Sequence, residues 1–173
     1  QPQNLVISAD DTPNNQRLAG KQGYGDARGI WQTIYIEARG QNFIDYVHFS
    51  PDVDRSMVKV EVGLNQLLNK EEALRLHFKN GEQDDFTYIP KGKARKSNIH
   101  TFEIELKDQQ LWDLDNPYLY EMEVALTSNT QTIDAVNTYF GQRKISVTNL
   151  PGSTFPYIAL NDKPVYMQLC LDQ

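Results

Sequence analysis

Several residue types that would define a class of chemistry are scarce in this sequence. Its 173 residues include one cysteine, which excludes an internal disulfide and a cysteine-based metal site. We expect Cys170 to be a small apolar residue in a buried strand. The histidines, His48, His77 and His100, lie far apart in the sequence, whereas a zinc site needs three or four convergent ligands. We therefore expect surface histidines, no metal and no cofactor.

Positive charge is also in short supply. The formal net charge is −6 and the pI is about 5.0, whereas nucleic-acid binding needs a basic surface that neutralises phosphates. No apolar run is long enough to cross a bilayer, so we expect neither a nucleic-acid nor a membrane partner. With 39% hydrophobic and 23% charged residues, the composition is that of a folded globular protein rather than a disordered one.

Alternation of apolar and polar residues is the dominant pattern in the middle of the chain. It is clearest in "SMVKVEV" (56–62), "ALRLHFK" (73–79), "IHTFEIEL" (99–106) and residues 118–126. One apolar and one charged face per strand is typical of antiparallel sheets packed face to face. These runs and the turns between them amount to roughly seven short strands, which predicts an all-β fold, an immunoglobulin-like antiparallel β-sandwich. In "LNQLLNKEEALRL" (64–76), Leu64, Leu67 and Leu68 share a face at helical spacing, and we interpret the stretch as a connection with about one helical turn.

The stretch "LWDLDNPYLYEMEVAL" (111–126) predicts a structural corner. Pro117 has a fixed φ and turns the chain before a new strand begins. We expect Tyr118 or Tyr120, at the start of that strand, to bury its ring and to send its hydroxyl back to a loop carbonyl, as a tyrosine corner does. Trp112 is expected to cover the open edge of the core.

The charged clusters have structural interpretations. Asp10-Asp11, Glu71-Glu72 and Asp84-Asp85 are sequence neighbours, which point to opposite faces of a strand and cannot act as a catalytic pair. We expect all three pairs in solvated turns or loops. The basic run "KGKARK" (91–96) is expected to be a solvated hairpin loop balanced by the acidic "GEQDD" (81–85). An anion or acidic-glycan contact is the functional alternative for this run.

The two ends do not fit the sandwich. "NLVISAD" (4–10) and "GIWQTIYIEA" (29–38) look like strands on either side of a long polar segment. Two strands cannot form a stable domain alone. "PVYMQLCLDQ" (164–173) is nearly all apolar, as strands covered on both faces are. We expect the chain to stop at the beginning of an α/β domain, and both ends to leave hydrophobic surface exposed.

Four motifs resemble, in their order, the glycoside hydrolase family 2 enzymes, which include β-galactosidases, β-glucuronidases and β-mannosidases. "GIWQTIYIE" resembles the closing strand of the family's jelly-roll domain. "LWDLDNPYLYEMEVAL" resembles the corner of its immunoglobulin-like domain. "YFGQRKISV" carries the Phe-Gly-x-Arg pattern at Phe140, Gly141 and Arg143, and "IALNDKPVYMQLCLDQ" is similar to the lead into the first barrel strand. Asp162 stands where the family often has Gly, and "QLCLDQ" (168–173) departs from the family's usual Arg-Gly-Val-Asn-Arg-His.

The resemblance implies a domain organisation. Residues 1–40 would be the end of a sugar-binding jelly roll, 41–148 a whole immunoglobulin-like sandwich, and 149–173 a linker and the first strand of a TIM barrel. The neighbouring jelly-roll and barrel domains and an oligosaccharide substrate would be the partners. Both catalytic Glu residues of a retaining hydrolase would lie on later barrel strands, so we expect no catalytic residue in this chain. Related enzymes are often exported, so a periplasmic or secreted location is favoured over a cytoplasmic one.

Two residues are candidates for substrate binding in the longer enzyme that the resemblance implies. Asp26 lies in the loop 11–29, which in the family approaches the sugar site, and Asp172 follows the lead into the barrel, at the rim where such barrels place their sites. Ordinary loop polarity is the alternative for both. For Trp31, packing in the core or between domains is favoured over sugar stacking.

Two other functions stay open for the chain as a whole. It could be a stand-alone carbohydrate-binding module or a protein-interaction sandwich. A carbohydrate-binding module needs an exposed aromatic platform, whereas most aromatic residues here fall on the apolar faces of the expected strands.

Overall fold

A computed structural model describes residues 5–10, 29–30, 32–81, 83–129 and 131–170. The chain divides into two units, one formed by Gln1–Ala38 with Gln168–Gln173 and the other by Arg39–Met167. All the helices and strands of the described residues lie in the second unit. The described residues of the first unit have no regular secondary structure.

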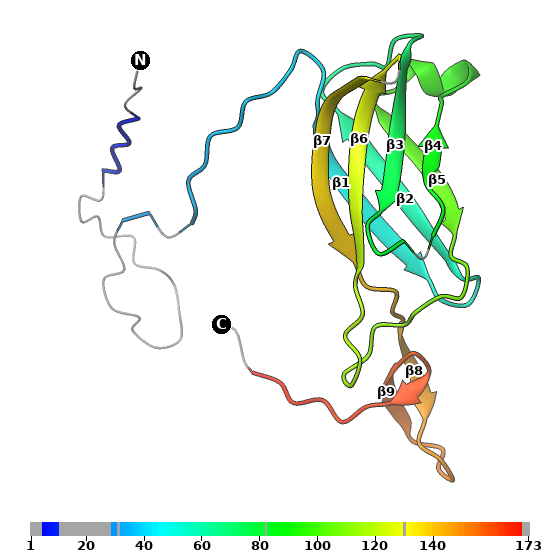
Figure 1. Cartoon of the computed structure of the whole chain (residues 1–173). Helices are drawn as coiled ribbons and strands as arrows, with labels where there is room; N and C mark the ends of the chain where they lie inside the picture. Colours follow the sequence, from blue (N-terminus) through cyan, green and yellow to red (C-terminus); the bar gives the residue numbers. More distant parts are fainter. Residues whose placement is uncertain (1–4, 11–28, 31, 82, 130, 171–173) are drawn as a thin grey trace. The chain divides into compact units, whose positions relative to one another are not determined.

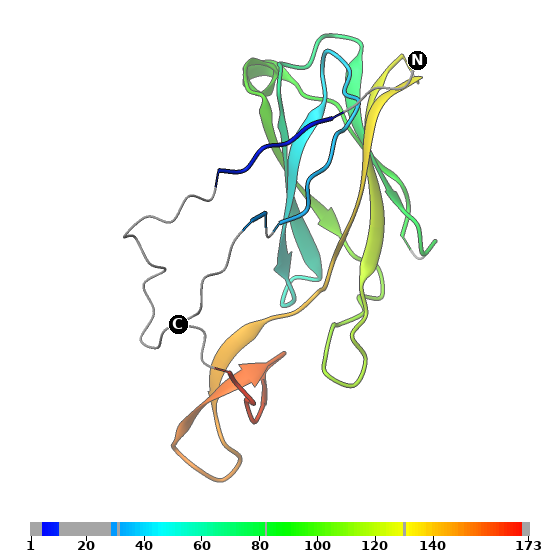
Figure 2. The same cartoon turned by 90° about the vertical axis from the view of Figure 1, so that its left-hand side faces the viewer.

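Seven strands of the second unit form two antiparallel sheets (Figures 1 and 2). The three-stranded sheet has the order β1-β2-β5, with bounds Ile44–Asp52, Met57–Leu64 and Ile99–Glu105. The four-stranded sheet has the order β4-β3-β6-β7, with bounds Phe86–Tyr88, Glu72–Phe78, Tyr120–Ser128 and Gln131–Phe140. The only helix of the described residues is a 3-10 helix, η1, at Gly92–Lys96. This arrangement confirms the all-β, antiparallel sandwich that the alternation predicted.

The core lies between the two sheets, where alternate residues of each strand meet. Val58, Val60 and Val62 of β2 are fully buried, and so are Leu74 and Leu76 of β3. Because side chains alternate between the faces of a strand, the charged residues between them reach solvent. Rings close the edge between β4 and β5, where Tyr88 stacks on Phe102 at 4.7 Å and Phe86 stacks on Phe102 at 5.1 Å.

A smaller sheet follows the sandwich in the chain (Figure 1). It has the order β10-β9-β8, with bounds Lys163–Pro164, Pro156–Leu160 and Ile145–Asn149. The strands β8 and β9 pair with Val147 opposite Ile158 and Ile145 opposite Leu160. The side chain of Ile145 is 66% exposed and that of Val147 is 70% exposed. This three-stranded unit, here called the β8–β10 hairpin, therefore has an apolar face that the described residues do not cover.

The expected strands at the two ends do not form. The described residues within 4–10 and 29–38 have no strand, and after β10 the residues 165–170 have none either. Pairing defines a strand, and none of the described residues of these segments belongs to a ladder. Val6, Tyr35, Ile36, Tyr166 and Leu169 are exposed, as expected for the ends. Cys170 is also exposed, so its expected place in a buried strand is wrong.

The structure corrects two expectations about polar residues. His48 and His77 are exposed as expected, but His100 is buried. It lies on β5 at the same parity as Phe102 and Ile104, so its side chain points into the core. Glu72 is buried rather than solvated, because its Oε2 accepts hydrogen bonds from the backbone N–H of Asn69 and from Asn42 Nδ2.

Two connections also differ from the sequence-based interpretation. Residues 65–71 join β2 to β3 without a helical turn. The basic run 91–96 contains the helix η1, and the described acids of 81–85 pair with other residues. Asp84 pairs with Lys107, and Asp85 pairs with Arg75 and His77.

Candidate functional site

The predicted corner is centred on Tyr120 at the start of β6. Its ring is buried and stacks on Phe140 with centroids 4.9 Å apart, and the Tyr118 ring meets it edge-on at 5.0 Å. The Tyr120 hydroxyl accepts a hydrogen bond of 2.7 Å from the backbone N–H of Gln110. The residue closes the loop that precedes its strand, and the loop group joined by this hydrogen bond is an amide N–H.

A short turn precedes this tyrosine. The Asp113 carboxylate accepts hydrogen bonds from the backbone N–H groups of Asp115 at 2.9 Å and Asn116 at 2.7 Å. This is the local side-chain bonding that makes Asp common in turns. A β-bridge joins Trp112 to Pro117 across the turn. The four residues named for the corner, Trp112, Pro117, Tyr118 and Tyr120, therefore lie in one loop and the start of one strand.

Trp112 connects the corner to the segment that leaves the sandwich. Its backbone N–H donates to the Gln142 carbonyl at 2.9 Å. A Cβ atom at Gly141 would lie 3.2 Å from three side-chain atoms of Trp112, so glycine allows the close approach of the exit segment. The Arg143 guanidinium stacks over the indole at 4.8 Å from the ring centroid. Trp112 is half-buried, because it packs against the exit segment of the Phe-Gly-x-Arg motif.

Gln142 is a buried polar residue that the sequence analysis missed. Its Nε2 lies within hydrogen-bonding distance of the carbonyls of Asp52 and Met57, both at 3.2 Å, and of Gln109 Oε1 at 3.1 Å. These contacts tie the exit segment to the turn between β1 and β2. The position between Gly141 and Arg143 gave no signal for burial, because glutamine is mostly exposed in proteins.

Asn161 attaches the β8–β10 hairpin to the corner. Its Nδ2 donates to the Trp112 carbonyl at 3.0 Å, and its Oδ1 accepts from the backbone N–H of Lys144 at 3.0 Å. Its own N–H donates to the Lys144 carbonyl at 2.8 Å. Asn161 and Asp162 both have positive φ, at 49° and 63°, which Asn and Asp tolerate better than most residues. Asn161, in the Leu-Asn-Asp sequence, therefore connects the β8–β10 hairpin to the corner.

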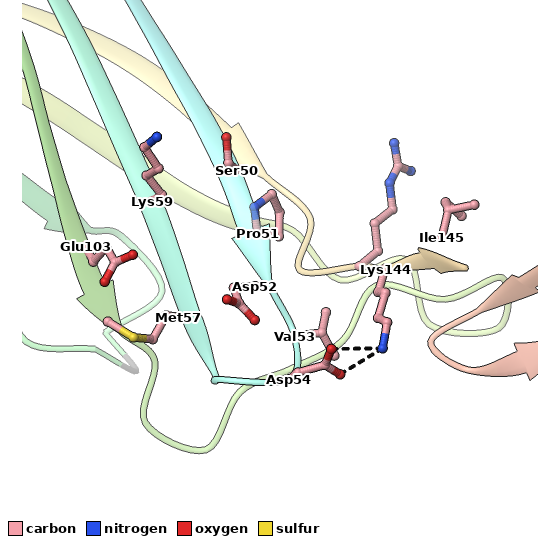
Figure 3. A pocket seen from close by; sticks show the side chains of 11 residues that line it. Ser50, Pro51, Asp52, Val53, Asp54, Met57, Lys59, Glu103, Lys144 and Ile145 are labelled. Atoms are coloured by element: carbon pink, nitrogen blue, oxygen red, sulfur yellow. Dashed lines mark hydrogen bonds and ion pairs between the residues drawn. The ribbon is translucent and has the colours of Figure 1, made fainter. Parts of the chain in front are cut away.

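Lys144 adds an ionic contact at the same place. Its Nζ lies 2.9 Å from Asp54 and 3.1 Å from Asp162, and Figure 3 shows the bonds to Asp54 beside the end of β1. The hydrogen bond to Asp54 raises the pKa of Lys144 most, and the hydrogen bond to Asp162 raises it further. The pKa of Asp162 is lowered mainly by the hydrogen bond from Lys144 and to a smaller extent by the hydrogen bond from Ser146.

A groove lies beside the corner. Its lining includes Pro51, Trp112, Leu119, Tyr139, Arg143 and Ile145, and its volume is about 540 Å³. The side chain of Tyr139 is 65% exposed there. The groove is open and largely apolar, unlike the polar hollow of Figure 3, which is lined by Ser50, Asp52, Lys59, Glu103 and Lys144.

Among the described carboxylates, Asp85 and Asp162 do not have the raised pKa of a general acid. A general acid needs a raised pKa so that it is protonated near neutral pH, whereas the pKa values of Asp85 and Asp162 are both lowered by hydrogen bonds from neighbouring cations. Within the described ranges, no group of three or more His, Cys, Asp or Glu side chains could hold a metal ion. No helix among these residues has the length and apolar character to cross a membrane.

The two candidate substrate-binding residues, Asp26 and Asp172, lie outside the described residues, and so does Trp31. The structure brings the corner residues together. Further residues that contact the corner or the segment that leaves it are Gln110, Gln142, Lys144 and Asn161.

The fold and the corner define an immunoglobulin-like β-sandwich domain with an attached hairpin. The family model described as "Glycosyl hydrolases family 2" matches residues 42–143. This is more than half of the chain, and the chain therefore belongs to glycosyl hydrolase family 2. The match confirms the family that the four sequence motifs indicated.

Curated relatives include two β-galactosidases. The enzyme of Thermoanaerobacterium thermosulfurigenes is 31% identical over 148 residues, which cover 81% of this chain and 20% of that protein. β-Galactosidase BoGH2A of Bacteroides ovatus is 34% identical over 62 residues, which cover 36% of this chain and 7% of that protein. The chain thus spans a fifth or less of the length of these relatives. Among solved structures, a β-glucuronidase of Ruminococcus gnavus is similar, with 17% identity, a TM-score of 0.49, and coverage of 74% of this chain and 19% of that one.

Proposed function

We propose that this sandwich is a non-catalytic, architectural domain of a longer family 2 glycosidase that hydrolyses O-glycosidic bonds, with a β-galactosidase-like substrate class. The observation that carries the proposal is the family match over residues 42–143, in a chain that spans 20% of a β-galactosidase relative. The catalytic carboxylates would then lie in another domain of the enzyme.

The contacts at the corner support an architectural role. The sandwich buries its own core, and Trp112, Lys144 and Asn161 hold the β8–β10 hairpin by specific polar bonds. The hairpin in turn exposes Ile145 and Val147. A rigid spacer that positions neighbouring domains would contribute to catalysis by holding active-site loops in place, because preorganised geometry carries much of a rate enhancement. A jelly-roll domain before the sandwich and a barrel after it are the proposed neighbours.

Asp26 and Asp172 are the proposed substrate contacts in the longer enzyme. A carboxylate at a sugar site can accept hydrogen bonds from sugar hydroxyls. Removing either one from the whole enzyme should raise KM for the glycoside.

Hydrolysis of nitrophenyl β-D-galactoside tests the proposal. The chain of residues 1–173 should give no rate above buffer, and the protein encoded by the longer reading frame should hydrolyse the substrate with retention of configuration. Turnover by the chain alone, removed by substitution of a carboxylate within it, would show that the domain is catalytic. Saturable binding of neutral oligosaccharides by the chain alone would favour a carbohydrate-binding module.

A further inference from the structure

Arg143 differs from the other arginines of the described residues. The others each reach an oxygen acceptor: Arg39 at Ile44 and Asp134, Arg55 at Glu103, Arg75 at Asp85, and Arg95 at Asn69. The Arg143 guanidinium stacks on the Trp112 ring, and within the described part of the chain no oxygen acceptor meets it. It therefore presents a fork of N–H donors whose geometry matches a carboxylate.

The guanidinium is also held in place before any partner arrives. Trp112, on which it stacks, is fixed by backbone bonds to Gln142 and by the Asn161 side chain. A planar guanidinium stacked on a ring loses less side-chain entropy when it binds a carboxylate than a free one does. This makes Arg143 an anchor with a defined direction rather than a mobile surface charge.

Arg143 lines both the polar hollow of Figure 3 and the groove, and its neighbours in the groove are mostly apolar. Tyr139 is 65% exposed, Ile145 is 66% exposed and Leu119 is 37% exposed, and all three line the groove with Arg143. Ile145 lies on the same face of the hairpin as Val147, since side chains two residues apart share a face. The groove is thus continuous with the uncovered apolar face of the β8–β10 hairpin.

This combination fits a protein surface better than a sugar. A sugar has many hydroxyl groups and needs several polar partners, whereas the groove offers a guanidinium and the Tyr139 hydroxyl among largely apolar side chains. Protein interfaces have an apolar core that is rich in tyrosine and arginine and poor in lysine and acids.

We propose that the groove of Tyr139, Arg143 and Ile145 is a docking surface for a neighbouring domain of the same glycosidase. The docked surface presents an Asp or Glu carboxylate flanked by apolar side chains. The carboxylate forms a bidentate pair with Arg143, and the apolar side chains cover Tyr139 and Ile145. This inference rests on the proposed function, because it supplies the contact through which the sandwich would hold its neighbour.

Hydroxyl-radical footprinting of side chains tests the docking surface directly. The oxidation rate of Tyr139 is compared between the chain 1–173 and the protein of the longer reading frame. We expect Tyr139 to react at least about fivefold more slowly in the longer protein, because the core of an interface excludes water. Tyr46, which is 39% exposed and does not line the groove, is the internal control and should react equally in both.

Two matched variants of the longer protein identify the role of Arg143. Arg143→Gln should restore about half or more of the lost Tyr139 reactivity, since truncating one member of a desolvated charge pair weakens docking strongly. Arg55→Gln is the control, because Arg55 is an exposed arginine whose Glu103 partner lies within the sandwich. Thermal unfolding of both variants in the chain 1–173 should stay close to that of the parent, which separates docking from folding.

The outcomes separate this inference from the proposed function. An active longer enzyme in which Tyr139 stays as reactive as in the chain alone overturns the docking surface and leaves the proposed function standing. If Tyr139 is protected in the longer protein and neither Arg143→Gln nor Arg55→Gln changes that protection, the role of Arg143 is overturned. Protection of Tyr139 in the chain alone by tetragalacturonate would assign the groove to acidic sugars, and concentration-dependent protection would assign it to a second copy. Either result would contradict the inference.

Discussion

The seven-stranded sandwich and the β8–β10 hairpin use their apolar residues in opposite ways. In the sandwich, alternate side chains such as Val60 and Leu76 are fully buried between two sheets. In the hairpin, Ile145 and Val147 alternate with polar residues in the same manner, but they are exposed. Burial of apolar area stabilises the sandwich, whereas polar bonds of Asn161 and Lys144 place the hairpin. The difference teaches that an alternating pattern predicts a strand but does not say what covers its apolar face.

The largest expected effect comes from substitutions of Tyr120, at the corner of the sandwich. Tyr120→Ala should lower the free energy of unfolding by about 3–5 kcal/mol, because it removes a buried ring that stacks on Phe140. Tyr120→Phe keeps the ring and removes the hydroxyl bonded to Gln110, so it should cost about 1 kcal/mol. Urea denaturation followed by circular dichroism measures both. Equal losses for the two variants would mean that the hydroxyl, rather than the ring, stabilises the corner.

Substitutions of Asn161, which connects the sandwich to the β8–β10 hairpin, should destabilise the hairpin and leave the sandwich unchanged. Asn161→Ala removes bonds to Trp112 and Lys144 and places alanine at a positive φ, so the hairpin should open more easily by about 2–3 kcal/mol. Asn161→Gly removes the same bonds but tolerates the backbone angle, and its effect should be smaller. Amide hydrogen exchange of β8 and β9 reports the opening. Equal effects of both variants throughout β2, β3 and β6 would show that the two regions unfold as one.

A matched pair of valines sharpens the comparison itself. Val60→Ala should destabilise the chain by about 2 kcal/mol, since it empties space in the core. Val147→Ala changes a residue that is 70% exposed, and it should stay within about 0.5 kcal/mol of the parent. The free energies of unfolding come from urea titrations. A cost for Val147→Ala near that of Val60→Ala would mean that the hairpin face is covered in solution.

The smallest expected effect is a pH dependence within the sandwich. Burial lowers the pKa of His100 below its ordinary value of 6.5, so the unfolded chain binds a proton at a higher pH than the folded one. The free energy of unfolding should therefore fall as the pH drops below about 6.5. His100→Phe keeps a ring beside Tyr88, which lies 5.6 Å away, and should reduce this slope. Urea midpoints between pH 7.5 and 5 measure it, and an unchanged slope would show that another group titrates.

The sequence predicted the sandwich better than the contacts that connect the β8–β10 hairpin to it. Strands β2, β3, β5 and β6 follow from short-range alternation, which is a local property of the chain. The burial of His100 follows from the same rule, because it shares the parity of Phe102 on β5, whereas the expectation from sequence placed all three histidines on the surface. The described residues of 4–10, 29–38 and 165–170 form no strand, since strand pairing depends on a partner that local sequence does not specify.

The candidate site was predicted in its aromatic residues and missed in its polar ones. Trp112 and Tyr120 stand out because large rings beside a proline turn are rarely incidental. Gln142 and Asn161 act through bonds to backbone groups distant in sequence, and single polar residues carry no periodic signal. The Leu-Asn-Asp turn before Lys163 was the one available hint, since Asn and Asp are the residues that best tolerate positive φ.

Amide hydrogen exchange on the chain 1–173 and on the protein of the longer reading frame tests the central claim, a self-sufficient sandwich that offers its hairpin end to a neighbour. In the chain alone, amides of β2, β3 and β6 should exchange only by global unfolding, and those of β8 and β9 should exchange much faster by local opening. In the longer protein, the β8 and β9 amides should become as slow as those of the sandwich. Equal protection of both regions in the chain alone, with no change in the longer protein, would contradict the claim.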